Sequence, residues 1–154
     1  MNVDYINPIY SAANQVFKNM FDLEVEKGEL DVFEDIVPTK EANVNISVTG
    51  ELKGTILFSF PKEMALQMVE DMAGMETEKF DKFVASAIGE LANIISGNAL
   101  NNLSEKNFEC NIAPPQISLG ENKTYSTATD KILVIPLITD YGKFDLSVAI
   151  RQAN

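Results

Sequence analysis

Glu90 and Asn93 have residue types and a spacing that could do chemistry together. They are three positions apart, and residues i and i+3 lie side by side on a helix. A carboxamide can donate to and accept from one water molecule, so Asn93 could orient a water for in-line attack on a phosphoryl group. A carboxylate one turn away could pair with a lysine. The two residues predict a projecting half-site whose partner supplies the phosphate, the metal and the lysine.

The element that must position this pair is a long helix, predicted over residues 78–105. Its apolar residues recur at helical spacing: Val84, Ile88, Leu91, Ile95 and Ala99. At about 100° per residue, Ser86, Glu90, Asn93 and Gly97 fall within an arc of roughly 60° on the other side. Asn and Gly are poor mid-helix residues, so this bare face favours close approach by another protein. An ordinary solvated face is the alternative, because a lone Glu-x-x-Asn is a weak signal.

The rest of the chain predicts an α+β fold in one domain, residues 1–154, with a largely antiparallel sheet and two further helices. The predicted helices run from Asn7-Pro8 to about residue 21 and from Pro61 to Gly74. The predicted strands lie within 24–33, in a hairpin over 42–60 with its turn at Gly50–Gly54, and at 108–112, 116–119, 123–129, 131–138 and 144–150. Pro136 indicates an edge or a bulge. Met64, Met68 and Met72 form a stripe that is more typical of core than of a binding groove.

Composition excludes several classes of function. With no histidine among 154 residues, Ser–His and Cys–His nucleophiles and most zinc sites are excluded. One cysteine, Cys110, cannot form an internal disulfide, which favours a cytoplasmic location. The net charge of −11 argues against nucleic acid and anionic membranes as partners, and no run approaches the ~20 apolar residues of a membrane helix.

The acidic residues are concentrated in one part of the chain. Residues 22–81 hold 15 of the 23 acids and 5 of the 12 bases. This stretch is either a solubilising surface, which we favour, or a surface that meets a basic patch on a partner.

The run from Ser86 to Ala99 resembles the signature of the CheC/CheX/FliY phosphatase family. That signature is Asp or Ser, three residues, Glu, two residues, Asn, and a proline about 22 residues later. Here 21 residues separate Asn93 from Pro115, and residues 115–120 are similar to the family's Pro-x-x-x-x-Gly. The similarity covers roughly residues 4–120. CheC and FliY carry two Glu-x-x-Asn sites, so the single copy in this chain indicates the CheX branch.

The resemblance implies a CheC-like fold and hydrolysis of the aspartyl phosphate of a CheY-type response regulator. Asn93 would enter the regulator's active site and orient the attacking water, while Glu90 would pair with one of its lysines. We expect Ser86, Gly97, Asn98 and Pro115 to contact the partner. The regulator would hold Mg²⁺, so no cofactor or metal is expected on this chain, and a homodimer formed through the sheets is implied. The alternative is a non-catalytic module that docks a receiver domain through the same face.

Overall fold

The structure is a computed structural model that describes residues 3–120, 124–126 and 131–153. Its helices are α1 (Val3–Phe21), α2 (Lys62–Ala73) and α3 (Lys82–Glu105). Its strands are β1 (Glu26–Lys27), β2 (Asp31–Phe33), β3 (Ile36–Pro38), β4 (Ala42–Gly50), β5 (Leu52–Phe60), β6 (Cys110–Ile112), β7 (Gln116–Leu119), β8 (Thr124–Ser126), β9 (Ile132–Thr139) and β10 (Gly142–Gln152).

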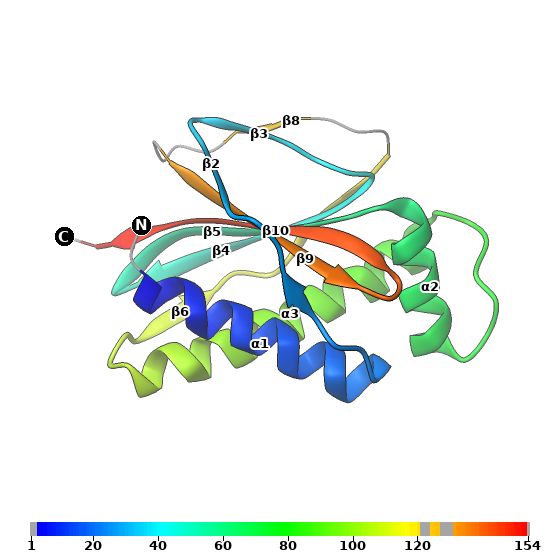
Figure 1. Cartoon of the computed structure of the whole chain (residues 1–154), viewed down its shortest axis with the longest axis horizontal. Helices are drawn as coiled ribbons and strands as arrows, with labels where there is room; N and C mark the ends of the chain where they lie inside the picture. The colour runs from blue at the N-terminus through cyan, green and yellow to red at the C-terminus, as the bar shows by residue number, and fades with distance from the viewer. Residues whose placement is uncertain (1–2, 121–123, 127–130, 154) are drawn as a thin grey trace.

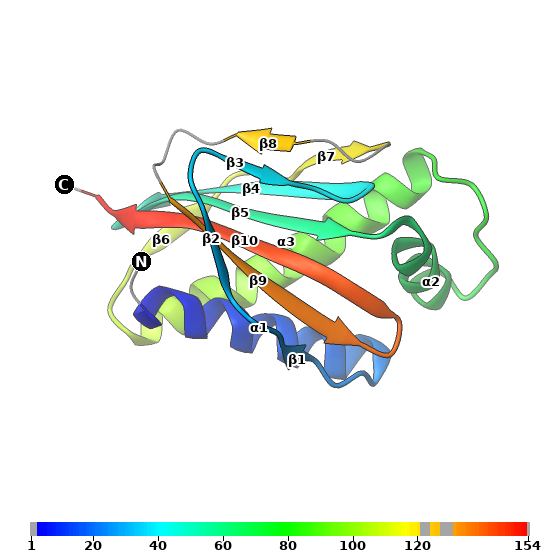
Figure 2. The ribbon, with the colours of Figure 1, turned by 45° about the horizontal axis from the view of Figure 1, so that its top comes forward.

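Eight of the strands form one antiparallel sheet, in the order β1-β9-β10-β5-β4-β6, with β2 also pairing with β9 and β7 also pairing with β4 (Figures 1 and 2). Along β4, buried residues alternate with half-buried ones. Val44, Ile46 and Val48 belong to the core, whereas Asn43 and Asn45 point to the opposite face. The antiparallel sheet confirms the predicted α+β class.

The helices cover one face of this sheet. Figure 1 shows α1 and α3 side by side beneath it, with α2 at one end. Between them, the Phe144 ring stacks on Phe17 and on Phe60, with ring centroids 5.0 and 4.7 Å apart. Met64 and Met68 are fully buried in the same core, as predicted for the methionine stripe. Ile88, Leu91 and Ile95 of α3 belong to the same core and hold this helix on the sheet, and α3 carries the candidate site.

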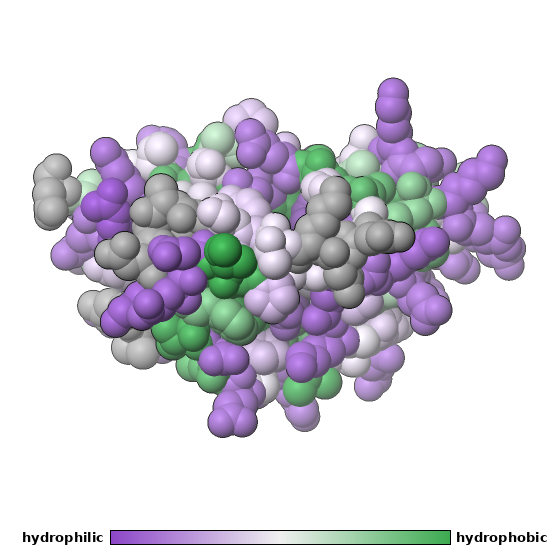
Figure 3. Space-filling view, turned by 90° about the horizontal axis from the view of Figure 1, so that it is seen from above, coloured by the Kyte–Doolittle hydropathy of each residue, from purple (hydrophilic) through white to green (hydrophobic). Residues whose placement is uncertain are grey.

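The other face of the sheet is partly covered by an arch, in which β3 pairs with β8. Val37, Leu57, Ile132, Val134 and Ala149 form a second, small core beneath it. Seen from this side, the surface mixes hydrophobic and hydrophilic side chains (Figure 3). The arch was not predicted from the sequence. Of the strand expected at 123–129, the structure describes only residues 124–126, and the others lie outside the described residues.

Two predicted boundaries near the N-terminus are wrong. The first helix begins at Val3, so Pro8 lies inside it rather than at its first position. Tyr5 and Ile6 are buried in the core, and that burial favours helix on the N-terminal side of the proline. Residues 24–33 form two short strands, β1 and β2, rather than one, and both pair with β9.

Gly54 and Pro136 have positions that the strand pairing explains. Gly54 lies within β5, not in the predicted turn, and its φ is +147°. A Cβ there would lie 1.8 Å from the backbone oxygen of Ala149, so only glycine allows β10 to approach β5 this closely. Pro136 lies between the β9 residues that pair with β1 and those that pair with β2. The N–H that proline lacks is therefore not needed for pairing with either strand.

Candidate functional site

The start of α3 is fixed by a side-chain cap. The Asp81 carboxylate accepts hydrogen bonds from the backbone N–H groups of Phe83 and Val84, at 3.1 and 3.3 Å. The helix therefore begins at Lys82, four residues after the predicted start at 78. Near its other end, the Asn102 side chain donates to the backbone oxygen of Pro8 in α1, at 3.0 Å. The helix is held at both ends as well as along its length.

The inner side of α3 is fully packed. The predicted stripe is buried, and Leu103 extends it: Val84, Ile88, Leu91, Ile95, Ala99 and Leu103. By length and mean hydropathy alone α3 could cross a membrane, but nine of its residues are buried inside the protein. That burial is typical of a core helix.

The outer side of α3 carries the predicted constellation. Ser86 and Glu90 are exposed, and Asn93 and Gly97 are half-buried. All four fall within roughly 60° of the helix circumference, with Glu90 and Asn93 about 4.5 Å apart along the axis. Within the part of the chain that the structure describes, the Glu90 and Asn93 side chains make no hydrogen bond or ion pair. Their hydrogen-bonding capacity is therefore free for water or a partner.

Pro115 reaches the site through the segment that enters β7. A methyl group added at Gly89 would lie 3.7 Å from Cγ of Pro115, 3.1 Å from Cγ1 of Ile117 and 2.7 Å from Cδ1 of Ile117. The segment therefore lies directly against α3 at Gly89, about 40° around the helix axis from Asn93. Gly89 is buried, and glycine there allows this close approach. The sequence interpretation did not single out Gly89 or Ile117, although a glycine inside a helix was itself a signal of close packing.

The structure does not bring Asn98 together with the other predicted residues. At 100° per residue it lies about 80° from Glu90 and about 140° from Asn93 around the axis. It is half-buried on the flank of α3 rather than on the outer face. Gly97 is on that face, and a Cβ there would meet nothing within 4 Å. Packing within the chain therefore does not require a glycine at position 97.

The other reactive groups provide no competing site. Cys110 is half-buried, and burial raises the pKa of its thiol, which disfavours the nucleophilic thiolate. The Tyr141 hydroxyl bonds to the Asp71 carboxylate, and this bond raises the pKa of Tyr141. Over residues 3–120, 124–126 and 131–153, no three acidic or cysteine side chains are grouped so that they could hold a metal ion.

The sequence pattern of the family described as chemotaxis phosphatase CheX matches residues 42–137, which include α3 and β7. The chain belongs to this family. Its similarity to the CheY-P phosphatase CheX of Thermotoga maritima is 26% identity over the whole of both chains.

Solved structures of the same family share the fold. A CheC-like superfamily protein from a Shewanella species has a TM-score of 0.90 at 29% identity, over 98% of this chain and 99% of the other. CheX from Borrelia burgdorferi, in a complex with CheY, BeF₃ and Mg²⁺, has a TM-score of 0.79 at 28% identity, over 98% of this chain and 100% of the other. These similarities confirm the predicted family and the CheC-like fold.

Proposed function

We propose that this chain hydrolyses the aspartyl phosphate of a phosphorylated CheY-type response regulator. The observation that carries the proposal is the outer face of α3, where Glu90 and Asn93 are accessible and unpaired within the described chain. Membership of the CheX family and full-length similarity to a CheY-P phosphatase support the substrate class.

In the proposed reaction, Asn93 enters the active site of the regulator and orients one water. The carboxamide oxygen accepts a hydrogen bond from that water, and the carboxamide N–H donates to it, so that a lone pair of the water faces the phosphorus. The bond from the water oxygen to phosphorus forms as the bond to the aspartyl oxygen breaks. The products are the free aspartate carboxylate and dihydrogen phosphate, which carries the oxygen and both protons of the water.

Glu90 has a positioning role in this proposal. Its carboxylate pairs with a lysine of the regulator and so fixes where Asn93 enters. Ser86 and Gly97 share the face with the pair, Pro115 lies against Gly89, and all three would contact the partner. Asn98, on the flank of the helix, would lie at the margin of this contact. Mg²⁺ belongs to the regulator, and no step is assigned to a metal on this chain.

The test follows the decay of phosphorylated CheY-type regulator with and without this protein. Wild-type protein should accelerate the decay, and Asn93→Ala should reduce that acceleration on the order of 10²–10³-fold, because the water loses its orientation. Asn14→Ala is the matched control, since Asn14 is also a half-buried helical asparagine but lies in α1. A wild-type protein that leaves the decay at its spontaneous rate would exclude catalysis. Full activity in Asn93→Ala would exclude the assigned role.

The alternative function, a module that binds the receiver without turnover, predicts a different result from the same samples. Stable binding of the phosphorylated regulator by wild-type protein, with no change in its decay, would favour that module.

We also propose that the protein is a cytoplasmic homodimer that associates through its sheet. The sheet offers two outer edges, one with β6 and β7 and one with β1 and β2. Val32 and Ile36 are exposed apolar residues near the second edge and the arch. Light scattering after size-exclusion chromatography should give twice the mass of one chain, and a mass of one chain would contradict the dimer.

A further inference from the structure

An exposed aromatic residue lies on the functional face of α3. Phe83 is 53% exposed, although it is a large apolar side chain. It lies seven positions before Glu90, so the two lie within about 20° of each other around the helix and about 10 Å apart along it. Its backbone N–H is held by the Asp81 cap, so the residue is fixed in place before any partner arrives.

Phe83 borders an open hollow in the loop between α2 and α3. The hollow has a volume of ≈270 Å³, and a second exposed apolar residue, Met75, lines it at 63% exposure. The remaining lining residues are polar or charged: Glu76, Thr77, Glu78, Lys79 and Asp81. Exposed apolar residues next to charged ones are a combination found at protein interfaces.

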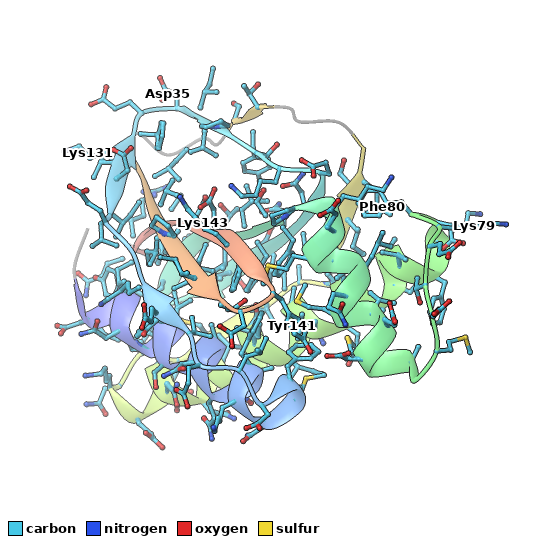
Figure 4. The ribbon with its side chains drawn as sticks, turned by 45° about the vertical axis from the view of Figure 1, so that its right-hand side comes forward. Asp35, Lys79, Phe80, Lys131, Tyr141 and Lys143 are labelled. Carbon is cyan, nitrogen blue, oxygen red and sulfur yellow. The ribbon has the colours of Figure 1, made fainter. Side chains whose placement is uncertain are left out.

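The loop that carries the hollow is anchored to the body of the protein. The Lys62 ammonium lies 5.6 Å from the centre of the Phe80 ring, which joins the loop to the start of α2. Figure 4 shows Phe80 close to the first turn of α2, while Lys79 points outward. Phe80 is half-buried, whereas Phe83 is exposed, so the two aromatic residues have different surroundings.

A contact surface of standard size, centred on Asn93, would also include Phe83. A standard interface covers about 800 Å² on each partner, which corresponds to a disc of roughly 16 Å radius. Phe83 lies ten residues from Asn93, about 15 Å along the axis. In the other direction, α3 presents Gly97 and Asn101, and no exposed large apolar side chain follows Asn93 in the rest of this helix. Ile117, 36% exposed, lies beside Gly89, between Phe83 and Asn93 along the axis, so the exposed apolar side chains next to this face lie on the Phe83 side of Asn93.

We propose that Phe83 and Met75 form a docking surface that binds the receiver domain while Asn93 acts on its aspartyl phosphate. This inference rests on the proposed function and assigns receiver affinity to residues outside the Glu-x-x-Asn motif. The receiver surface that fits is apolar with basic groups, because three of the four charged residues around the hollow are acidic. Phe83 is a binding residue here and takes no part in the chemistry.

The test measures two quantities on the full chain. The first is the dissociation constant for a CheY-type regulator loaded with beryllofluoride and magnesium, and the second is the pair kcat and KM for dephosphorylation. Phe83→Ala should weaken binding and raise KM by about tenfold or more, as truncation of an aromatic anchor does, while kcat at saturation is retained. Phe83→Leu should have a smaller effect, and Met75→Ala about a threefold effect.

Leu30→Ala is the matched control. Leu30 is 46% exposed, and it lies between β1 and β2 at the opposite edge of the sheet from β7, which packs on α3. This variant should leave the dissociation constant, kcat and KM unchanged.

The outcomes separate this inference from the proposed function. A dissociation constant for folded Phe83→Ala within twofold of wild type would overturn the docking surface, even if Asn93→Ala abolishes hydrolysis. Wild-type protein that binds the loaded regulator but leaves its phosphate intact would overturn the proposed catalysis, even if Phe83→Ala weakens binding. Circular dichroism identifies any variant that has lost its fold, and Phe83→Leu then decides the docking question.

Discussion

The two sides of α3 differ in what their residues contact. On the inner side, Val84, Ile88 and Leu91 are fully buried against the sheet. On the outer side, Glu90 and Asn93 make no side-chain hydrogen bond or ion pair with any described residue. The same helix is therefore a core element and a functional surface, with the two roles assigned to different residues.

This separation predicts that stability and activity can be changed independently. The inner residues hold the helix in place and have no access to a partner, and the outer residues could be replaced without opening a cavity. Substitutions on the two sides test the separation directly.

The largest effect is expected for Leu91→Ala on the inner side. Removing this fully buried side chain leaves a cavity between α3 and the sheet, and the free energy of unfolding should fall by about 2–5 kcal/mol. Chemical denaturation measures the loss, and the fraction that stays folded should keep its kcat. Ser86→Ala, on the outer side of the same helix, should change stability by no more than about 0.5 kcal/mol. A loss below about 1 kcal/mol in Leu91→Ala would contradict the assigned core position.

A smaller effect, confined to activity, is expected for Glu90→Gln. The variant keeps the shape of the side chain and removes its charge, so the proposed pairing with a lysine of the regulator weakens. We expect KM to rise about tenfold at low salt, with thermal stability unchanged. Because salt screens the wild-type pair, the gap between variant and wild type should narrow at high ionic strength. Glu105→Gln is the control, since Glu105 is exposed at the last position of α3. Equal KM values in wild type and Glu90→Gln at low salt would exclude the pairing.

The smallest effect is expected for Gly97→Ala, and it should have opposite signs for the two properties. A methyl group meets nothing within 4 Å at this position, so the variant should gain up to about 1 kcal/mol of stability from helix propensity. The same methyl group projects from the face that the partner approaches and hinders close contact, so KM should rise a few-fold. Gly89→Ala provides the comparison, because Ile117 must move there and should reduce the gain. A Gly97→Ala variant with unchanged KM would place residue 97 outside the interface.

Periodicity predicted much of the fold because the relevant burial is local. The β4–β5 hairpin alternates in sequence as it does in space, and the Gly74 cap and the buried stripe of α3 follow local rules. Gly54 was misjudged because the strand that requires a glycine there, β10, is almost a hundred residues away. Local turn chemistry does not distinguish a glycine in a turn from one that a distant backbone approaches.

The candidate site also has features that local sequence predicts and features that depend on distant parts of the chain. The shared face of Ser86, Glu90, Asn93 and Gly97 follows from helix geometry alone, whereas the contact of Ile117 with Gly89 depends on how β7 returns to α3. Phe83 could have been found from its seven-residue spacing to Glu90. It was missed because the face was defined by its polar and small residues, and Phe83 is apolar. The assigned roles of Glu90 and Asn93 stay predictions until the decay of the phosphorylated regulator is measured.

The position of β10 has a consequence for how the chain folds. This last strand lies in the middle of the sheet, between β5 and β9, and its pairing with β5 joins residues that are far apart in sequence. The sheet therefore cannot be completed until the end of β10 is available, and such long-range pairing slows folding. A nascent chain that ends before β10 would present two unpaired strand edges, from β5 and β9, which are prone to pair with other chains. Loss of the final strand should thus cause aggregation during synthesis rather than a mild loss of activity.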